Sequence, residues 1–445
     1  MTDVVVFIDA LSPRELRGVL SEWHQGSMDA SVPRVTPRVL SSIYTGQSPA
    51  NNGMMSVSRY GEDGASRPSL STFIDRLVAA DWSVLSAGMP FTIPFRSTNE
   101  RSLLHGTGVG GQEQCLPEDA ASWLTLPAPD GDMIREHPDT VYASFHDQTK
   151  AKFHLFKENI RRAKPDVAFL GYRLIDSYCH FQHTENRRGQ PYREHLIETV
   201  AGLLDRIERQ VAGDVLFFSD HGQTELTNTF RVNRWLAEKG YLEYDVDRDF
   251  LDTVQQRGAD SPQSPPVSNQ VSIGQMGVSI DEQASDVVCD DPFDGCLDLL
   301  TDPASFDTED FREDLLGTGL FRSVEYKWEK YDVDAHHYDT VPDVLPDRDE
   351  GVFVSGNVHP EPIGMGYHRT GVHDYTACFG ATCELEIPSG NGREGYITPE
   401  QMHDVICDFV GLDEPPSPVT KADANQMTPE EASKAIDAIN EVHGR

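Results

Sequence analysis

The chain has 445 residues, of which 38% are hydrophobic, so it can form one large domain with insertions or several small ones, and wholesale disorder is excluded. Its 73 acidic residues outnumber 37 basic ones, and the net charge of -36 excludes a general nucleic-acid-binding protein, which would carry a basic stripe. The acid is dispersed and only nine basic residues are lysine, which indicates a surface adapted to high salt and a halophilic source.

The cysteines and the hydropathy of the chain indicate the cellular compartment in which the protein is expected. Seven scattered cysteines without a CxxC pair predict reduced thiols, most of them buried. The first apolar run reaches Asp9 after a handful of residues, so we expect no signal peptide, and no run approaches the length of a membrane-spanning helix. The sequence predicts a cytoplasmic protein that does not bind membranes, and it leaves open whether the chain forms a homo-oligomer.

Three apolar runs without polar alternation are typical of strands buried on both faces of a sheet: DVVVFIDAL, PDVAFLGYRLID and GDVLFFSDHG. Helical patterns lie between them, including STFIDRLVAADW and REHLIETVAGLLDRIERQV. This alternation predicts an α/β fold with a mostly parallel central sheet and helices on both faces.

The composition changes along the chain and predicts four regions. Residues 1–244 form the first part of the core, and the acidic, Pro- and Ser-rich stretch 245–345 forms an inserted small cap. Residues 346–412 return to the core, with EGVFVSGN and TACFGATCELEI as strands. Residues 413–445 form a linker and one amphipathic helix.

Each of the three apolar runs ends in an aspartate, at Asp9, Asp176 and Asp220. Ligands of open α/β sheets bind beyond the carboxyl ends of the strands, so the three carboxylates should converge. Two histidines accompany them: His180 lies four residues after Asp176 on one predicted helical face, and His221 follows Asp220 directly. Carboxylates with imidazoles suit Zn²⁺ or Mn²⁺ better than Ca²⁺.

Thr36 and Pro37 begin a helical pattern, as do the Thr-Pro pairs at Thr398 and Thr428. The latter two have Gln401 and Glu431 three residues on, which completes a capping box. Thr36 has no such partner, and Arg38 places a cation where the helix dipole favours an anion. We therefore predict that Thr36 is both a helix cap and a residue facing a bound phosphate, which the free N–H groups of a helix start attract.

These residues resemble a known family. FIDAL, Thr36 followed by Thr45 and Gly46, IDSYCH and FSDHG are similar to the alkaline phosphatase superfamily, most closely to its type I phosphodiesterase and nucleotide pyrophosphatase branch. TFRVNRWLAEKGYL also resembles prokaryotic members of that branch. The likeness covers roughly residues 1–240 and 350–412 and leaves the acidic insertion and the tail unmatched.

The resemblance implies a phosphate-ester hydrolase with two divalent metal ions, zinc or alternatively manganese. It implies that one metal is held by Asp9, Asp220, His221 and the Thr36 oxygen. It further implies that the other is held by Asp176, His180 and a late histidine, for which we select His373 with His368 as the alternative. Thr36 would be the nucleophile, forming a phospho-threonine that water hydrolyses, because a metal lowers the pKa of its hydroxyl.

Substrate contacts are less clearly encoded. Arg38 and Asn52 are candidates for substrate binding, Arg38 by holding phosphoryl oxygens. Asn52 stands where many nucleotide-cleaving members carry a histidine, and Val57 falls near an expected asparagine, which argues against a nucleotide substrate. Phosphomonoesterase and phosphonate hydrolase activities are the alternatives. A sulfatase is disfavoured because Thr36 cannot become formylglycine, and a non-catalytic binding module is disfavoured because every implied ligand is present.

Overall fold

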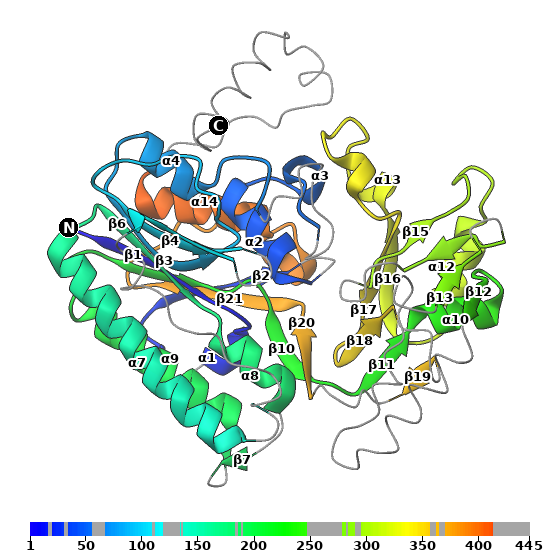
Figure 1. Ribbon diagram of the computed structural model, residues 1–445, viewed down its shortest axis with the longest axis horizontal. Coiled ribbons are helices and arrows are strands. Elements are labelled where there is room, and N and C mark those ends of the chain that lie inside the picture. Colours follow the sequence, from blue (N-terminus) through cyan, green and yellow to red (C-terminus); the bar gives the residue numbers. More distant parts are fainter. Residues whose placement is uncertain are drawn as a thin grey trace.

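The computed structural model describes residues 1–16, 20–30, 34–55, 67–108, 112–118, 134, 137–182, 186–187, 190–246, 278–281, 284–289, 295–356, 362–364 and 370–412. Its largest element is an eight-stranded sheet (Figure 1). In spatial order its strands are β2 (His24–Asp29), β21 (Thr376–Ala381), β9 (Val215–Phe218), β1 (Asp3–Ile8), β6 (Val167–Tyr172), β3 (Val84–Pro90), β4 (Leu103–Thr107) and β5 (Glu113–Leu116).

The three predicted apolar runs form the centre of this sheet. β1 pairs in parallel with β6 on one side and with β9 on the other. The pairs of β3 with β6 and with β4 are also parallel, whereas β21, β2 and β5 join antiparallel. The predicted α/β fold with a mostly parallel sheet is therefore confirmed, and TACFGATCELEI supplies β21 as expected.

Helices cover both faces of the sheet (Figure 1). One face carries α7 (Pro138–Ala163), α8 (Leu174–Gln182) and α9 (Tyr192–Glu208), and the other carries α2 (Thr36–Thr45), α4 (Phe73–Ala79) and α14 (Pro399–Val410). Val6 of β1 belongs to the cluster that contains Phe156 of α7, whereas Phe7 belongs to the cluster that contains Leu40 of α2. Alternate side chains of one strand thus fill two cores, which explains its uninterrupted apolar sequence.

Short elements connect the main ones. They are α1 (Pro13–Leu16), α3 (Pro49–Asn52), β7 (Asn186–Arg187), β8 (Gln190–Pro191), β10 (Gly222–Glu225), β20 (Gly371–Asp374) and the 3-10 turns η4 (Tyr338–Thr340) and η5 (Arg393–Gly395). The antiparallel pair of β10 and β20 lies beyond the carboxyl end of β9 and aligns Gln223 with His373.

A second lobe stands beside the main sheet (Figure 1). Its strands are β11 (Asn228–Arg231), β12 (Tyr244–Val246), β13 (Val278–Ile280), β14 (Val287–Val288), β15 (Asp298–Leu299), β16 (Phe321–Tyr326), β17 (Val344–Arg348), β18 (Val352–Ser355) and β19 (Ile363–Gly364). Its helices are α10 (Val232–Lys239), α12 (Thr308–Leu316) and α13 (Lys327–Lys330).

The predicted boundaries of the insertion, 245 and 345, fall inside this lobe and are corrected. Phe230 and Leu236 already pack in its hydrophobic cluster, which extends to Val354. EGVFVSGN forms β18, which pairs with β11 in the lobe rather than with the main sheet. The lobe begins early because the apolar side chains of β11 and α10 are buried against it. Residues 247–277 and the predicted tail 413–445, including the Thr428 cap, lie outside the described residues.

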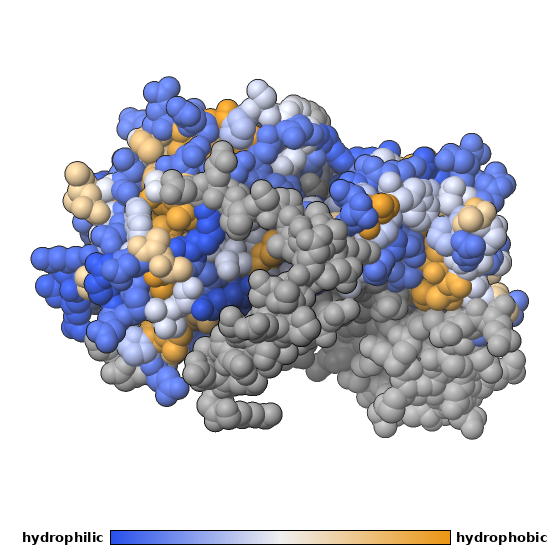
Figure 2. All heavy atoms as spheres, turned by 90° about the horizontal axis from the view of Figure 1, so that it is seen from above, coloured by the Kyte–Doolittle hydropathy of each residue, from blue (hydrophilic) through white to orange (hydrophobic). Residues whose placement is uncertain are grey.

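The visible surface of the described residues is mostly hydrophilic, with small scattered hydrophobic patches (Figure 2). No helix in the described part of the chain is long and apolar enough to cross a membrane. All seven cysteines are free, and six of them are buried, as the sequence predicts. These features agree with a large, acidic polypeptide whose apolar residues are mostly buried in its hydrophobic cores.

Candidate active site

The three predicted carboxylates converge at one edge of the sheet. Asp9 directly follows β1, Asp220 lies two residues beyond β9, and Asp176 lies in the first turn of α8 after β6. Because β9, β1 and β6 are adjacent and parallel, their carboxyl ends lie side by side. Asp9 and Asp220 are fully buried, and Asp176 is 8% exposed.

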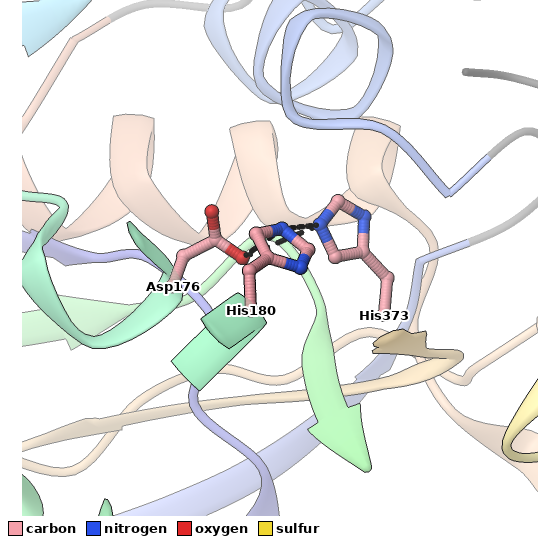
Figure 3. Close-up of side chains that lie close together, drawn as sticks. All are labelled: Asp176, His180 and His373. Atoms are coloured by element: carbon pink, nitrogen blue, oxygen red, sulfur yellow. Dashed lines mark hydrogen bonds and ion pairs between the residues drawn. The ribbon is translucent and has the colours of Figure 1, made fainter. Parts of the chain in front are cut away.

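Asp176 forms a compact group with two histidines (Figure 3). Its Oδ1 lies 3.1 Å from His180 Nε2 and 3.3 Å from His373 Nε2. His180 shares a face of α8 with Asp176, as the spacing predicts, whereas β20 brings His373 from almost 200 residues away. The three side chains have the chemistry and spacing of a metal-binding group.

Each imidazole ring of this site has its Nδ1 atom beside a backbone carbonyl oxygen. The Nδ1 atoms of His180, His373 and His221 lie 3.2, 2.6 and 2.9 Å from the carbonyl oxygens of Gly371, Arg34 and Gly222. A ring that donates from Nδ1 carries its lone pair on Nε2. The Nε2 atoms of His180 and His373 are only 3.0 Å apart, so two lone pairs face each other. This arrangement suits imidazoles that share a cation, with each ring held by a carbonyl.

A second group lies next to the first. Asp9, Asp176 and His221 also place ligand atoms close enough to hold a metal ion. His221 Nε2 is 3.6 Å from Asp9 Oδ1 and 3.3 Å from Asp220 Oδ2. Both of these carboxylate oxygens are buried without a hydrogen-bond partner, a costly state that a cation would relieve. Asp176 belongs to both groups, although the sequence assigns it to one metal only.

Burial and like charges perturb the carboxylates. Burial, followed by the charges of Asp220 and Asp176, raises the pKa of Asp9 well above its usual range. Burial also raises the pKa of Asp220 to about 6. Burial opposes the ionisation of Asp176 too, but the adjacent His180 and His373 hold the pKa of Asp176 well below its usual range. Clustered carboxylates of this kind are stabilised by a bound cation.

Two of the three histidines are held neutral. Burial lowers the pKa of His221 well below its usual range. Burial lowers the pKa of His373 to about 4. Neutral rings keep the lone pairs that metal ligation requires. The donor set of these residues therefore fits a divalent cation.

Thr36 reaches this cluster from the start of α2. The helix begins at Thr36 itself, and its N-cap is Val35 in an extended conformation without a side-chain cap, so the prediction that Thr36 caps the helix is corrected. The Thr36 hydroxyl instead lies 3.2 Å from His221 Nε2. Thr398, in contrast, forms the predicted capping box with Gln401. The difference arises because Thr36 has already adopted helical backbone angles, which turn its side chain away from the helix end.

The other predicted residues have local partners or lie elsewhere. Arg38 donates a hydrogen bond from Nη1 to Ala30 O at 3.1 Å. The Asn52 side chain bonds the backbone of Gln47 and Met54, so it shapes its own loop. His368 lies outside the described residues. The predicted contacts of Arg38 and Asn52 with a substrate stay predictions.

The structure adds residues that sequence reasoning missed. Arg173 Nε lies 3.4 Å from Asp9 Oδ2, and the Arg173 side chain is 44% exposed. Gln223 donates to Asp176 Oδ1 at 3.3 Å and is itself held by Arg193, which also contacts Ala10 O. Arg173 and Gln223 stand close to the Asp176 and Asp220 motifs in the sequence. Nothing in the sequence indicates which way their side chains point.

The sequence matches the model of one protein family, described as type I phosphodiesterase / nucleotide pyrophosphatase, over residues 14–376. The chain belongs to this family. Its members are metal-dependent phosphoryl hydrolases, and this chain carries candidate metal-binding groups at the expected sheet edge. A search of curated protein sequences found no match.

Solved structures show the same fold. Phosphonoacetate hydrolase from Sinorhizobium meliloti 1021, in complex with phosphonoformate, superimposes with a TM-score of 0.58 at 14% identity, covering 93% of this chain and 95% of that one. Murine ectonucleotide pyrophosphatase / phosphodiesterase 5 superimposes with a TM-score of 0.52 at 13% identity, covering 94% of this chain and 96% of that one. Both similarities extend over nearly the whole chain, including the second lobe.

Proposed function

We propose that this chain hydrolyses phosphate diesters through a covalent intermediate on Thr36. The observation that carries the proposal is the position of the Thr36 hydroxyl, which lies 3.2 Å from His221 Nε2 at the edge of a cluster of three carboxylates and three imidazoles. Membership of the type I phosphodiesterase / nucleotide pyrophosphatase family supports phosphoryl chemistry and favours diesters.

The residues divide into two metal-binding sets. Asp9, Asp220, His221 and the Thr36 oxygen would hold one divalent cation, and Asp176, His180 and His373 would hold the other, with Asp176 close to both. Zinc and manganese both suit this set of nitrogen and oxygen ligands. Two such cations lower the pKa of a coordinated hydroxyl and neutralise charge on the phosphoryl oxygens.

The chain itself positions the reacting groups. Oγ1 of Thr36 attacks phosphorus, the bond to one ester oxygen breaks, and an alcohol leaves. Water then attacks the phosphorus of the phospho-threonine, which releases a phosphate monoester and restores the hydroxyl. Backbone N–H groups at the start of α2, together with the partly exposed Arg173, are available to phosphoryl oxygens.

The test is a comparison of two Thr-Pro helix starts. We expect Thr36→Ala to reduce turnover of bis-p-nitrophenyl phosphate by about a thousandfold or more in the metal-loaded chain, because a lost nucleophile is not replaced. Thr36→Ser should retain part of the activity. The control, Thr398→Ala, removes only a helix cap, which costs about 1 kcal/mol of stability, and should leave turnover unchanged.

Substrate preference is measured in the same assay. Turnover that survives Thr36→Ala or chelation of the metal would contradict the mechanism. A preference for p-nitrophenyl phosphate, phosphonoacetate or p-nitrophenyl sulfate would replace the diester with a monoester, a phosphonate or a sulfate ester, respectively. The halophilic composition requires that these assays include high salt.

A further inference from the structure

A cavity separate from the catalytic cluster lies between the main sheet with its helices and the second lobe. It has a volume of about 690 Å³, which is large enough for a small-molecule ligand. Its walls come from α2, α3 and α14 on one side and from β16 and β17 on the other. No residue of the predicted catalytic cluster lines it, so it is a different site.

Arg38 is the unusual residue in this cavity. Its side chain lines the cavity although Arg38 is only 2% exposed, and its Nε has no hydrogen-bond partner. Within the described part of the chain no carboxylate lies within 4.0 Å of its guanidinium, which donates a hydrogen bond to the carbonyl oxygen of Ala30. A buried cation without a counter-charge is unfavourable. An anion bound in this cavity would supply that counter-charge.

The helix geometry explains why Arg38 faces this cavity. Arg38 follows Thr36 by two residues, and residues at that spacing leave a helix on opposite sides. Thr36 points to His221, whereas Arg38 lines the cavity toward the second lobe. The same helix start thus presents one side chain to each site.

Neighbouring charges define the anion. Arg34 lines the same cavity, is 4% exposed, and forms a buried ion pair with Asp347 of β17, which also pairs with Arg393. The three arginines face two buried carboxylates, Asp347 and Asp29, which leaves one positive charge in excess.

The more exposed lining residues have the opposite balance. At the outer rim of the cavity, one basic side chain, Lys330, lies among four acidic ones: Glu325, Asp332, Glu400 and Asp404. A polyanion would be repelled at this rim, whereas a single small anion can reach the arginines.

We propose that this cavity is a binding site for a small oxyanion, inorganic phosphate or a phosphate monoester, held by Arg38 and Arg34. Guanidinium groups match the geometry of phosphate oxygens and form strong charge-assisted hydrogen bonds with them. The site is connected to the catalytic cluster, because the carbonyl oxygen of Arg34 lies 2.6 Å from His373 Nδ1. If the proposed function holds, the released phosphate monoester is itself a candidate occupant.

The test is calorimetric titration of inorganic phosphate into full-length Thr36→Ala protein, with chelator present and the sodium chloride concentration constant. Binding is measured without turnover and without metal, so its outcome is independent of the proposed hydrolysis. We expect Arg38→Gln to weaken phosphate binding by about tenfold or more, because a charge-assisted hydrogen bond is lost. The matched control is Arg209→Gln, which removes an exposed arginine that pairs with Asp205 outside both sites and should leave phosphate affinity unchanged. Arg173→Gln, at the catalytic cluster, tests whether phosphate binds there instead.

Two further variants keep the test decisive if Arg38→Gln does not fold. Arg38→Lys retains the charge and should bind phosphate more weakly than the parent but more tightly than Arg38→Gln. Ser323→Glu, on the lobe side of the cavity, adds a negative charge and should also weaken binding. The proposal is overturned if phosphate produces no binding heat at millimolar concentration, if Ser323→Glu leaves affinity intact, or if Arg173→Gln alone abolishes binding.

Discussion

At the scale of single residues, the site depends on side chains that contacts with the backbone hold in one orientation. Each of the three imidazoles places Nδ1 on a carbonyl oxygen, which directs Nε2 toward the carboxylates. Gly222 also helps to position His221. A Cβ atom at residue 222 would lie 2.4 Å from Thr376 O, so only glycine fits directly after His221. Pre-positioned ligands of this kind bind a cation without further ordering.

Gln223 is the residue whose importance is easiest to test. It donates to Asp176 at 3.3 Å, so Gln223→Met removes an orienting donor from a carboxylate shared by both metal groups. We expect a loss of about 10- to 100-fold in metal affinity, measured by competition with a chromophoric chelator, with a similar loss in turnover. Gln210→Met, at an exposed position just after the end of α9, is the control and should change neither. Equal metal affinity in both variants would contradict a role for Gln223 in orienting Asp176.

At the scale of elements, the start of α4 illustrates how a buried ion pair anchors a helix next to the sheet. Asp75 accepts hydrogen bonds from Thr72 N and Arg96 N, both at 2.9 Å, and pairs with Arg67; the Asp75 and Arg67 side chains are at most 2% exposed. Burial alone raises the pKa of Asp75, but the charge and hydrogen bond of Arg67, with the backbone donors, hold that pKa below its usual value.

Asp75→Asn should therefore lower the free energy of unfolding by about 3 kcal/mol at pH 7, because Arg67 is left buried without its counter-charge. Since the folded-state pKa is depressed, this contribution is present above about pH 4 and is lost as the pH falls through the folded-state value. Urea unfolding at pH 7 and at acid pH checks both points.

The control for this prediction is Asp81→Asn, which breaks an exposed pair with Arg101 and should cost less than about 1 kcal/mol at either pH. A stability difference between the parent and Asp75→Asn that grows toward acid pH would show that the pair does not favour the ionised carboxylate.

At the scale of the whole molecule, the net charge of -36 dominates the electrostatics. Repulsion among dispersed carboxylates destabilises the compact state, and salt reduces it as the Debye length falls from about 10 Å at 0.1 M to about 3 Å at 1 M. We therefore expect Tm to rise steeply with sodium chloride up to about 1 M and more slowly beyond it. Sucrose at matched osmolality should not reproduce the steep part. A Tm that is flat or falls between 0.1 and 1 M would contradict the predicted adaptation to salt.

The sequence by itself determined the central strands and their flanking helices, and its motifs predicted six of the seven residues proposed for catalysis and metal binding. It could do so because these features are local: an apolar run, a residue at its end, and an i, i+4 spacing. The likeness to the phosphodiesterase branch rested on the same local motifs, and the family match agrees with it. The seventh, His373, was selected by resemblance, because no spacing links it to Asp176.

Only the tertiary structure decided which distant segments meet. The pairing of β20 with β10 places His373 beside His180, and adjacent strands bring Asp176 close to both metal groups. It also turned Thr36 toward His221 and Arg38 toward a separate cavity, and it placed β11, α10 and β18 in the second lobe. These outcomes depend on contacts between residues that are up to about 340 positions apart, such as Arg34 and His373, and local sequence patterns carry no information about such contacts.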